Sequence, residues 1–156
     1  MTKGENEMKK KVSVLLVLLL AVSLLAGCGG GTEAPAAVET ITVSVLVETD
    51  QQNPQWFRDV EIPAGTNGFE LLDAATDGEV DAEWYAEFRS HFVSSILGVA
   101  PDGQEFWGAF LWNDQSEAWE PLPYGADWFS VKDGHIMGWA LAAYDPENPP
   151  LPQSTP

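Results

Sequence analysis

The chain has 156 residues, and 24 acidic residues against 7 basic ones give it a formal net charge of -17 at pH 7. This length accommodates one domain of modest size. The charge disfavours nucleic acid and anionic membrane faces as partners, since both repel a surface of the same sign. The single cysteine excludes an internal disulfide and a zinc site built from several cysteines.

The first thirty residues have the layout of a secretory signal sequence. Three lysines at 9–11 precede an apolar run over 12–25 that only two serines interrupt. As a helix this run rises roughly 21 Å at ~1.5 Å per residue, which is less than the ~30 Å hydrocarbon layer and disfavours a stable transmembrane span. Met1 and Met8 are both available as the start, and Met8 begins the more typical signal.

The only cysteine lies directly after this run, in Leu25-Ala26-Gly27-Cys28. This segment closely resembles the lipobox of bacterial lipoproteins, which implies cleavage before Cys28 and lipidation of its thiol. Two or three acyl chains, at ~0.8 kcal/mol per buried CH2, anchor a protein stably. The resemblance therefore implies an extracytoplasmic protein that is lipid-anchored to the bacterial cell membrane, with the membrane as a partner. A plain cleaved signal with a chance cysteine is the alternative.

The whole chain divides by composition into four parts. Residues 1–27 form the expected signal peptide, and residues 28–40 contain the cysteine and a Gly-, Ala- and Pro-rich flexible tether. Residues 145–156 contain five prolines, which favours an extended tail. The folded domain is therefore expected at 41–144.

The folded domain begins with a predicted hairpin and a helix. Apolar residues alternate with others over 41–47, which predicts a strand with one buried face, and 56–62 returns as its partner. Asn67 followed by Glu70 predicts a capping box for a short helix over about 68–76. Three apolar positions recur there at helical spacing, namely Phe69, Leu72 and Ala75 or Thr76.

The second half of the domain adds strands. Residues 84–98 fit either a second helical turn or a loop that enters a strand near 92–96. Residues 105–112 and 136–143 are apolar at both odd and even positions, so each of these two strands should be covered on both faces. The second of them, 136–143, follows the turn Asp133-Gly134 and is expected to be a central or final strand. The order predicts an α+β fold, with a small mixed β-sheet packed on one helix in a β-grasp-like outline.

Four segments carry a family resemblance. They are IPAGTNGFELLDAAT at 62–76, HFVSSILGV at 91–99, FWGAFLWND at 106–114 and YGADWFSVKDGHIMGWAL at 124–141. Together they resemble the C-terminal domain of transcobalamin and intrinsic factor and its stand-alone bacterial relatives. Two positions depart from that pattern: Asp114 follows Asn113 where the family usually has Gly, and His135 stands where an acidic residue usually follows Asp-Gly.

This resemblance covers most of 41–144 and implies a β-grasp-like fold that binds a soluble ligand. Cobalamin or another corrinoid is the ligand it suggests, and no other cofactor is expected. In the eukaryotic vitamin carriers a second, helical domain covers the other side of the ligand. Residues 41–144 leave no room for that domain, so we expect a surface or transport protein to complete such a site.

Catalytic motifs are sparse. A nucleophile with a base would require His91 or His135 beside a serine or aspartate, and Ser130, Asp133 and His135 lie close only within a turn. No phosphate-binding loop, dinucleotide fingerprint or HExxH motif occurs. The sequence therefore predicts no catalytic residues and a protein that is not an enzyme.

A calcium site is the weaker of the binding hypotheses. An EF-hand counted from Asp73 fails because Ala75 and Trp84 occupy ligand positions. An irregular site would use four acidic residues of the following loop, Asp77, Glu79, Asp81 and Glu83. A solvated acidic loop is the alternative, and no metal ligand is predicted.

Seven tryptophans exceed what a small core requires. Trp107 and Trp139 are expected in the core. The candidate ligand-binding residues are the four aromatic residues in segments that turns would expose, Trp112, Trp119, Tyr124 and Trp128. Local packing of loops is the alternative role for these four.

These features together predict a membrane-anchored lipoprotein that binds a soluble ligand without catalysis. An adhesion or assembly module that binds protein or glycan at the cell surface is the alternative function. A calcium-dependent domain is the third hypothesis.

Overall fold

The computed structural model describes residues 37–49, 53–143, 145 and 151–156. The chain divides into two units after residue 37, and every helix and strand of the described residues belongs to the second unit, 38–156. The signal sequence and Cys28 lie outside the described residues. No helix in the described ranges has the length and apolar character needed to cross a membrane.

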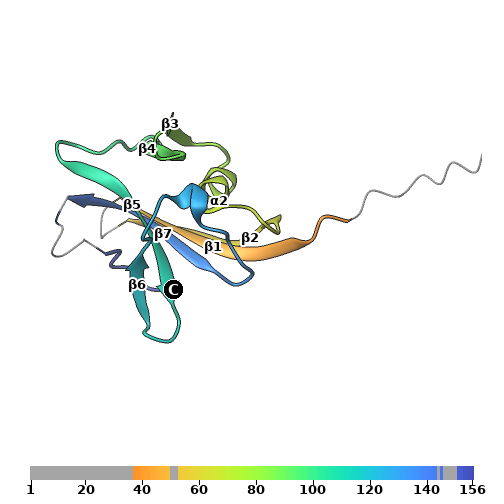
Figure 1. Cartoon of the computed structure of the whole chain (residues 1–156). Coiled ribbons are helices and arrows are strands. Elements are labelled where there is room, and N and C mark those ends of the chain that lie inside the picture. Colours follow the sequence, from red (N-terminus) through yellow and green to blue (C-terminus); the bar gives the residue numbers. More distant parts are fainter. Residues whose placement is uncertain (1–36, 50–52, 144, 146–150) are drawn as a thin grey trace, which may run out of the picture. The chain divides into compact units, whose positions relative to one another are not determined.

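A mixed five-stranded sheet forms the frame of the domain (Figure 1). Its strand order is β2-β1-β7-β5-β6, in which β1 pairs parallel with β7 and all other neighbours are antiparallel. The strands are β1 Thr40–Glu48, β2 Pro54–Pro63, β5 Glu105–Asn113, β6 Ala118–Pro121 and β7 Ile136–Ala143. The strands predicted at 41–47, 56–62, 105–112 and 136–143 are thereby confirmed, and β7 is both central in the sheet and last in the chain.

The helix α2, Gly68–Ala75, begins with the predicted capping box. The Glu70 N–H donates to Asn67 Oδ1 at 2.9 Å, and the Asn67 N–H donates to Glu70 Oε2 at 3.1 Å. Leu71 and Leu72 are its fully buried side chains, and Phe69 and Ala75 are half-buried and pack against the core, so the predicted apolar stripe is confirmed. The helix packs against the sheet, and Leu71 lies on the face of the helix that makes this contact.

The segment 84–98 contains no second helical turn. Two short strands, β3 Val80–Tyr85 and β4 Ser90–Ile96, pair as a separate antiparallel hairpin. The strand predicted near 92–96 is therefore confirmed, while β3 was not predicted. In Figure 1 this hairpin and α2 lie above the strands β1 and β7, and the edge strand β6 lies below them in the view.

Each face of the sheet has its own apolar cluster, because side chains alternate between the faces along a strand. On one face Val45, Val47 and Trp139 pack with α2 and the hairpin. On the other face Leu46 and Trp119 pack with neighbours from β5 and β7. The prediction that β5 and β7 are covered on both faces is confirmed, but β1 is also buried on both faces rather than on one.

The end of the chain belongs to the folded unit. The backbone N–H groups of Gln153 and Ser154 donate to the two carboxylate oxygens of Glu48, at 2.8 and 2.9 Å. Trp119 Nε1 donates to the Ser154 carbonyl at 2.7 Å. Residues 151–156 are thus fixed against the second face of the sheet, and the folded unit extends past the predicted end at residue 144. The resulting architecture is a β-rich α+β fold with one α-helix in its described part.

Candidate ligand-binding site

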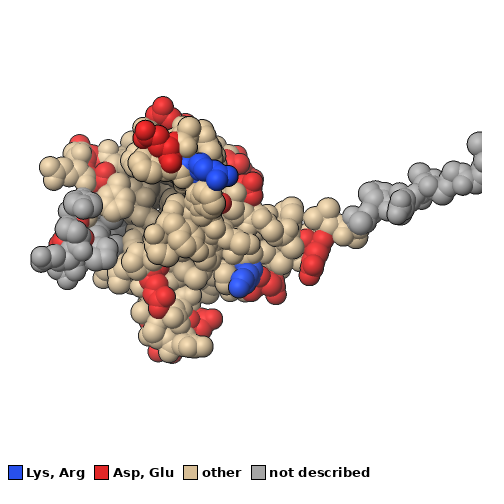
Figure 2. Space-filling model, viewed as in Figure 1, with Lys and Arg blue, Asp and Glu red and all other residues tan. Residues whose placement is uncertain are grey.

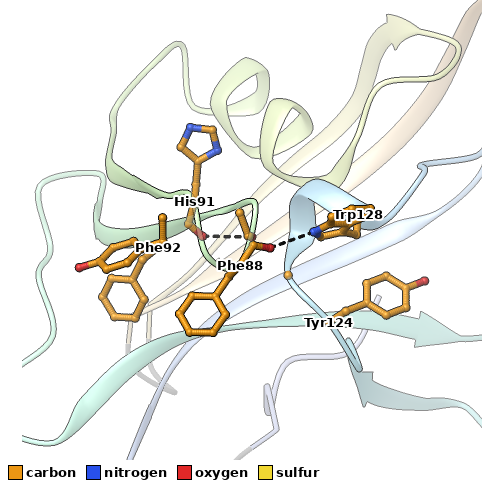
Figure 3. Close-up of a pocket in the computed structure, with 8 residues that line it drawn as sticks. Phe88, His91, Phe92, Tyr124 and Trp128 are labelled. Carbon is orange, nitrogen blue, oxygen red and sulfur yellow. Dashed lines mark hydrogen bonds between the residues drawn. The ribbon is translucent and has the colours of Figure 1, made fainter.

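A hollow of about 600 Å³ opens between the β3–β4 hairpin and the segment that leads into a short 3-10 helix, η1 Ala126–Trp128. The hairpin contributes Phe88 and Phe92, and the facing segment contributes Tyr124 and Trp128. Figure 3 shows the rings of Phe88 and Phe92 on one side and Tyr124 and Trp128 on the other. The hollow is therefore formed by two walls that are distant in the sequence.

Aromatic side chains gather on this part of the surface. The large apolar residues that the structure leaves between 42 and 70% exposed around the hairpin and η1 are Trp84, Tyr85, Phe88, Phe92, Tyr124 and Trp128. Exposed apolar patches of this kind on a soluble domain mark binding surfaces for ligands or partners. Aromatic rings suit this role because they offer a large rigid contact area with few rotatable bonds. The patch makes the hollow the candidate binding site.

Asp127 joins the two walls. One carboxylate oxygen accepts hydrogen bonds from Ser90 Oγ and the His91 N–H, both at 2.8 Å, and the other is 2.6 Å from His91 Nδ1. Burial would raise the pKa of Asp127, but the hydrogen bonds from His91 and Ser90, with the charge of His91, hold that pKa below its ordinary value. The carboxylate is thus stabilised in its charged form at the joint.

His91 lines the hollow, and its ring also supports the wall by packing against the helix. It stacks on Phe69 of α2 with ring centroids 4.0 Å apart and meets the edge of Trp84 at 5.0 Å. Figure 3 shows the ring directed away from Phe88 and Tyr124, toward the helix. Ser90 Oγ donates to the Asp127 carboxylate and to the His91 backbone carbonyl, not to the His91 ring, so these three residues lack the hydrogen-bond order of a Ser-His-Asp triad.

Further contacts fix the walls to each other. Trp128 Nε1 donates to the Phe88 carbonyl at 3.3 Å, and the Arg89 guanidinium lies 4.8 Å from the Trp128 ring centroid. A Cβ on Gly125 would lie 2.2 Å from Ser90 Oγ, so only glycine allows the two segments to approach this closely. The hollow is thus built before any ligand arrives, which reduces the ordering cost of binding.

The surface around the hollow carries few positive charges. Arg58, Arg89 and Lys132 are the only Lys or Arg residues after residue 27. In Figure 2 acidic side chains are scattered over the visible face, while basic ones occupy two small areas. The aromatic surface is therefore set in an acidic one, which disfavours polyanionic ligands.

The four predicted aromatic residues do not form one surface. Tyr124 and Trp128 line the hollow, both about half exposed. Trp119 is buried in the second face of the sheet, and Trp112 meets it edge-on with ring centroids 5.4 Å apart. Trp112 instead lines a separate cavity of about 360 Å³.

The hairpin residues of the site were missed from the sequence. Tyr85, Phe88 and Phe92 line the hollow, yet 84–98 was interpreted only as an ambiguous segment. Three aromatic residues within WYAEF at 84–88 were the available signal. Trp107 and Trp139 are buried, which confirms their predicted place in the core.

Asp133 and His135, which the sequence analysis considered as possible catalytic residues, make hydrogen bonds to the backbone. Asp133 Oδ1 accepts the Thr42 N–H at 2.8 Å, and His135 Nδ1 accepts the Lys132 N–H at 3.2 Å. Burial, and then the charge of Lys132, lower the pKa of His135. In the described part of the chain no three His, Cys, Asp or Glu side chains are grouped as a metal ion requires.

Sequence comparisons find no relatives. No protein-family model matches the chain, and no curated protein matches it. Solved structures do match. Haptocorrin in complex with Cbi is 15% identical with a TM-score of 0.57, over 76% of this chain but only 29% of haptocorrin. A candidate metal-binding protein from Ruminococcus gnavus is 20% identical with a TM-score of 0.53, over 67% of this chain and 99% of that protein.

These matches concern the fold. The chain spans less than a third of the length of haptocorrin, and at these identities the likeness carries no site residue from one protein to the other. With a TM-score of 0.57, the fold of this chain is similar to that of the matching part of haptocorrin. The domain therefore has a transcobalamin-like fold.

Proposed function

We propose that residues 38–156 bind a soluble ligand with a flat apolar body in the aromatic hollow, without catalysis. The observation that carries this proposal is the pair of fixed aromatic walls, formed by exposed rings of the hairpin and of the 124–128 segment. Rings that are already held at fixed positions lose little further conformational entropy when a ligand binds. Cobalamin or another corrinoid is the first ligand to test, since the resemblance suggests it and haptocorrin binds Cbi.

We also propose that the protein is a lipoprotein, anchored outside the cytoplasm through a lipidated Cys28. The support is the lipobox-like segment at 25–28 behind an apolar run. The test is metabolic labelling of the full chain with an alkyne fatty acid in a bacterial host. We expect label on the wild type and none on Cys28→Ser, whereas equal labelling of both would contradict lipidation at this residue.

The ligand is tested by titrating residues 38–156, which contain both apolar clusters, with cobalamin and its precursors. A thermal melt first establishes that this unit folds cooperatively. Tryptophan emission, corrected for absorption by the corrinoid, should be quenched saturably. Equilibrium dialysis then compares variants without relying on the tryptophan that is removed.

Two variants distinguish binding in the hollow from binding on the other face of the sheet. Trp128→Ala should weaken binding at least 10-fold, because a central aromatic contact at an interface is worth about 2 kcal/mol or more. Trp112→Ala is the matched control, since Trp112 does not line the hollow and its removal should leave affinity unchanged. A flat titration would exclude a free-standing corrinoid site and leave the adhesion or assembly module as the function to pursue.

A further inference from the structure

A second, smaller cavity adjoins the hollow. It measures about 180 Å³ and shares four lining residues with the hollow, namely His91, Phe92, Tyr124 and Gly125. The sheet contributes Trp107 and Ala109 of β5 and Trp139 of β7. We call it the inner cavity. It is large enough for a slender group of a few atoms, whereas the hollow is large enough for a ring system.

Trp139, which lines the inner cavity, carries a buried donor without a partner. Trp139 is 4% exposed, and its Nε1 is the one buried side-chain polar atom in the described residues that has no hydrogen bond. Trp107 lines the same cavity and differs, since its Nε1 donates to the Val99 carbonyl at 3.3 Å. Buried donors are nearly always paired in folded proteins, so an unpaired one requires an explanation.

The surroundings of Trp139 favour an acceptor carried by a ligand. The side chains that line the inner cavity are mostly apolar, such as Phe106 and Leu122. Water is held well only where two to four polar groups contact it. A carboxamide arm brings one carbonyl oxygen as the acceptor, and the methylene carbon that carries the amide occupies apolar space.

We infer that the inner cavity is a subsite for a slender hydrogen-bond-accepting arm, such as a carboxamide, on the ligand whose flat body lies in the hollow. The inference rests on the proposed function of the hollow. The Trp139 N–H donates to the oxygen of that arm. Because this N–H is covered in the empty domain, part of the lining must turn aside, and the stacked rings of Phe69 and His91 lie where the lining meets the hollow.

The test uses two naphthalene probes of similar size on the ¹⁵N-labelled unit 38–156. One is 1-naphthaleneacetamide, which carries the arm, and the other is 1-ethylnaphthalene, which has no acceptor. Indole N–H signals are followed by NMR, and those of Trp139 and Trp128 are assigned from Trp139→Phe and Trp128→Phe. We expect both probes to shift the Trp128 signal and only the amide to move the Trp139 proton downfield, as a new hydrogen bond does.

Affinities of variants provide the second readout. Trp139→Phe should weaken the amide about fivefold to tenfold, the size of one hydrogen bond, while leaving 1-ethylnaphthalene within about twofold. Trp107→Phe is the matched control, since its indole N–H is already paired. Ala109→Leu, which fills the inner cavity and leaves Trp139 in place, should weaken the amide selectively and keeps the test open if Trp139→Phe does not fold.

The outcomes separate this inference from the function it rests on. If both probes shift Trp128 but the Trp139 signal and the variants do not distinguish them, the hollow binds ligands and the inner cavity is not a subsite. If neither probe shifts the Trp128 signal, the hollow does not take flat apolar bodies, and the proposed function and this inference both fail.

Discussion

The domain has two aromatic regions, and the chain itself covers only one of them. On one face of the sheet Trp56, Trp112 and Trp119 cluster, with Trp119 within 6.5 Å of both neighbours and bonded to Ser154 at the end of the chain. On the other face the rings of the hairpin and of the 124–128 segment surround an open hollow. A high content of aromatic residues therefore does not identify a binding site.

What distinguishes the two regions is the position of the final residues. Residues 151–156 satisfy the Glu48 carboxylate and the Trp119 indole, so the first region is completed by the chain's own backbone. In the hollow, hydrogen bonds join the walls beneath the rings and leave the rings exposed. The covered region contributes to stability, and the open region is available for a ligand.

The largest expected difference is between Trp119→Ala and Trp128→Ala. Removing the buried Trp119 ring leaves a cavity over Gly138 and should lower the free energy of unfolding by about 3–5 kcal/mol. Trp128 is 51% exposed, so its removal should cost about 1 kcal/mol or less. Urea denaturation measures both values, and Trp119→Phe replaces Trp119→Ala if the latter does not fold. Equal losses would show that the two regions are not distinct.

The second largest loss of stability is expected from deleting the end of the chain. Deleting residues 151–156 removes two hydrogen bonds from the buried Glu48 carboxylate and one from Trp119, and should destabilise the unit by about 2–4 kcal/mol. Gln153→Ala is the matched control, because its contact with Glu48 is made by the backbone and should persist, within about 0.5 kcal/mol. Thermal melting that is unchanged by the deletion would contradict the docked chain end.

A smaller loss of stability than that from deleting the chain end is expected at the joint of the hollow. Asp127→Asn retains the shape of the side chain but loses the charged acceptor that serves Ser90 and His91, and should cost about 1–2 kcal/mol. Because the walls are held less firmly, affinity for a ligand in the hollow should also fall several-fold. Asp133→Asn, at a turn outside the hollow, is the control that should leave affinity unchanged.

The pH dependence follows from the direction of the Asp127 shift. Its pKa is lower in the folded than in the unfolded chain, so its contribution is complete above the unfolded value and is lost as pH falls through the folded value. The stability difference between wild type and Asp127→Asn should therefore be constant near neutral pH and shrink below the ordinary aspartate range. A difference that persists in acid would show that the carboxylate charge is not what holds the joint.

Much of the fold could be predicted from local sequence. Alternating valines at 41–47, the capping box of Asn67 and Glu70, and apolar runs at both parities in β5 and β7 each identify their element, because these signals depend on neighbours in the chain. The β3–β4 hairpin was ambiguous because β3 has no buried side chain. Burial therefore does not require its apolar and polar residues to alternate as they do in a half-buried strand.

The site could be predicted only in part. Tyr124 and Trp128, which the sequence offered as candidates, line the hollow, but Trp112 and Trp119 were grouped with them because all four follow or precede turns. Which aromatic rings remain exposed depends on contacts over long sequence separations. The bond from Trp119 to Ser154 spans 35 residues, and those from Ser90 and His91 to Asp127 span 37 and 36.

The sequence by itself determined strands β1, β2, β5 and β7, the helix α2, the acidic charge, the lipobox-like segment and the abundance of aromatic residues. Only the tertiary structure decided which aromatic region is covered and which is open, because the segments that cover Trp119 and join the hollow are brought together by the sheet and not by the local pattern. Local physical chemistry fixes the period and the caps of an element. Exposure is a property of the whole packed chain.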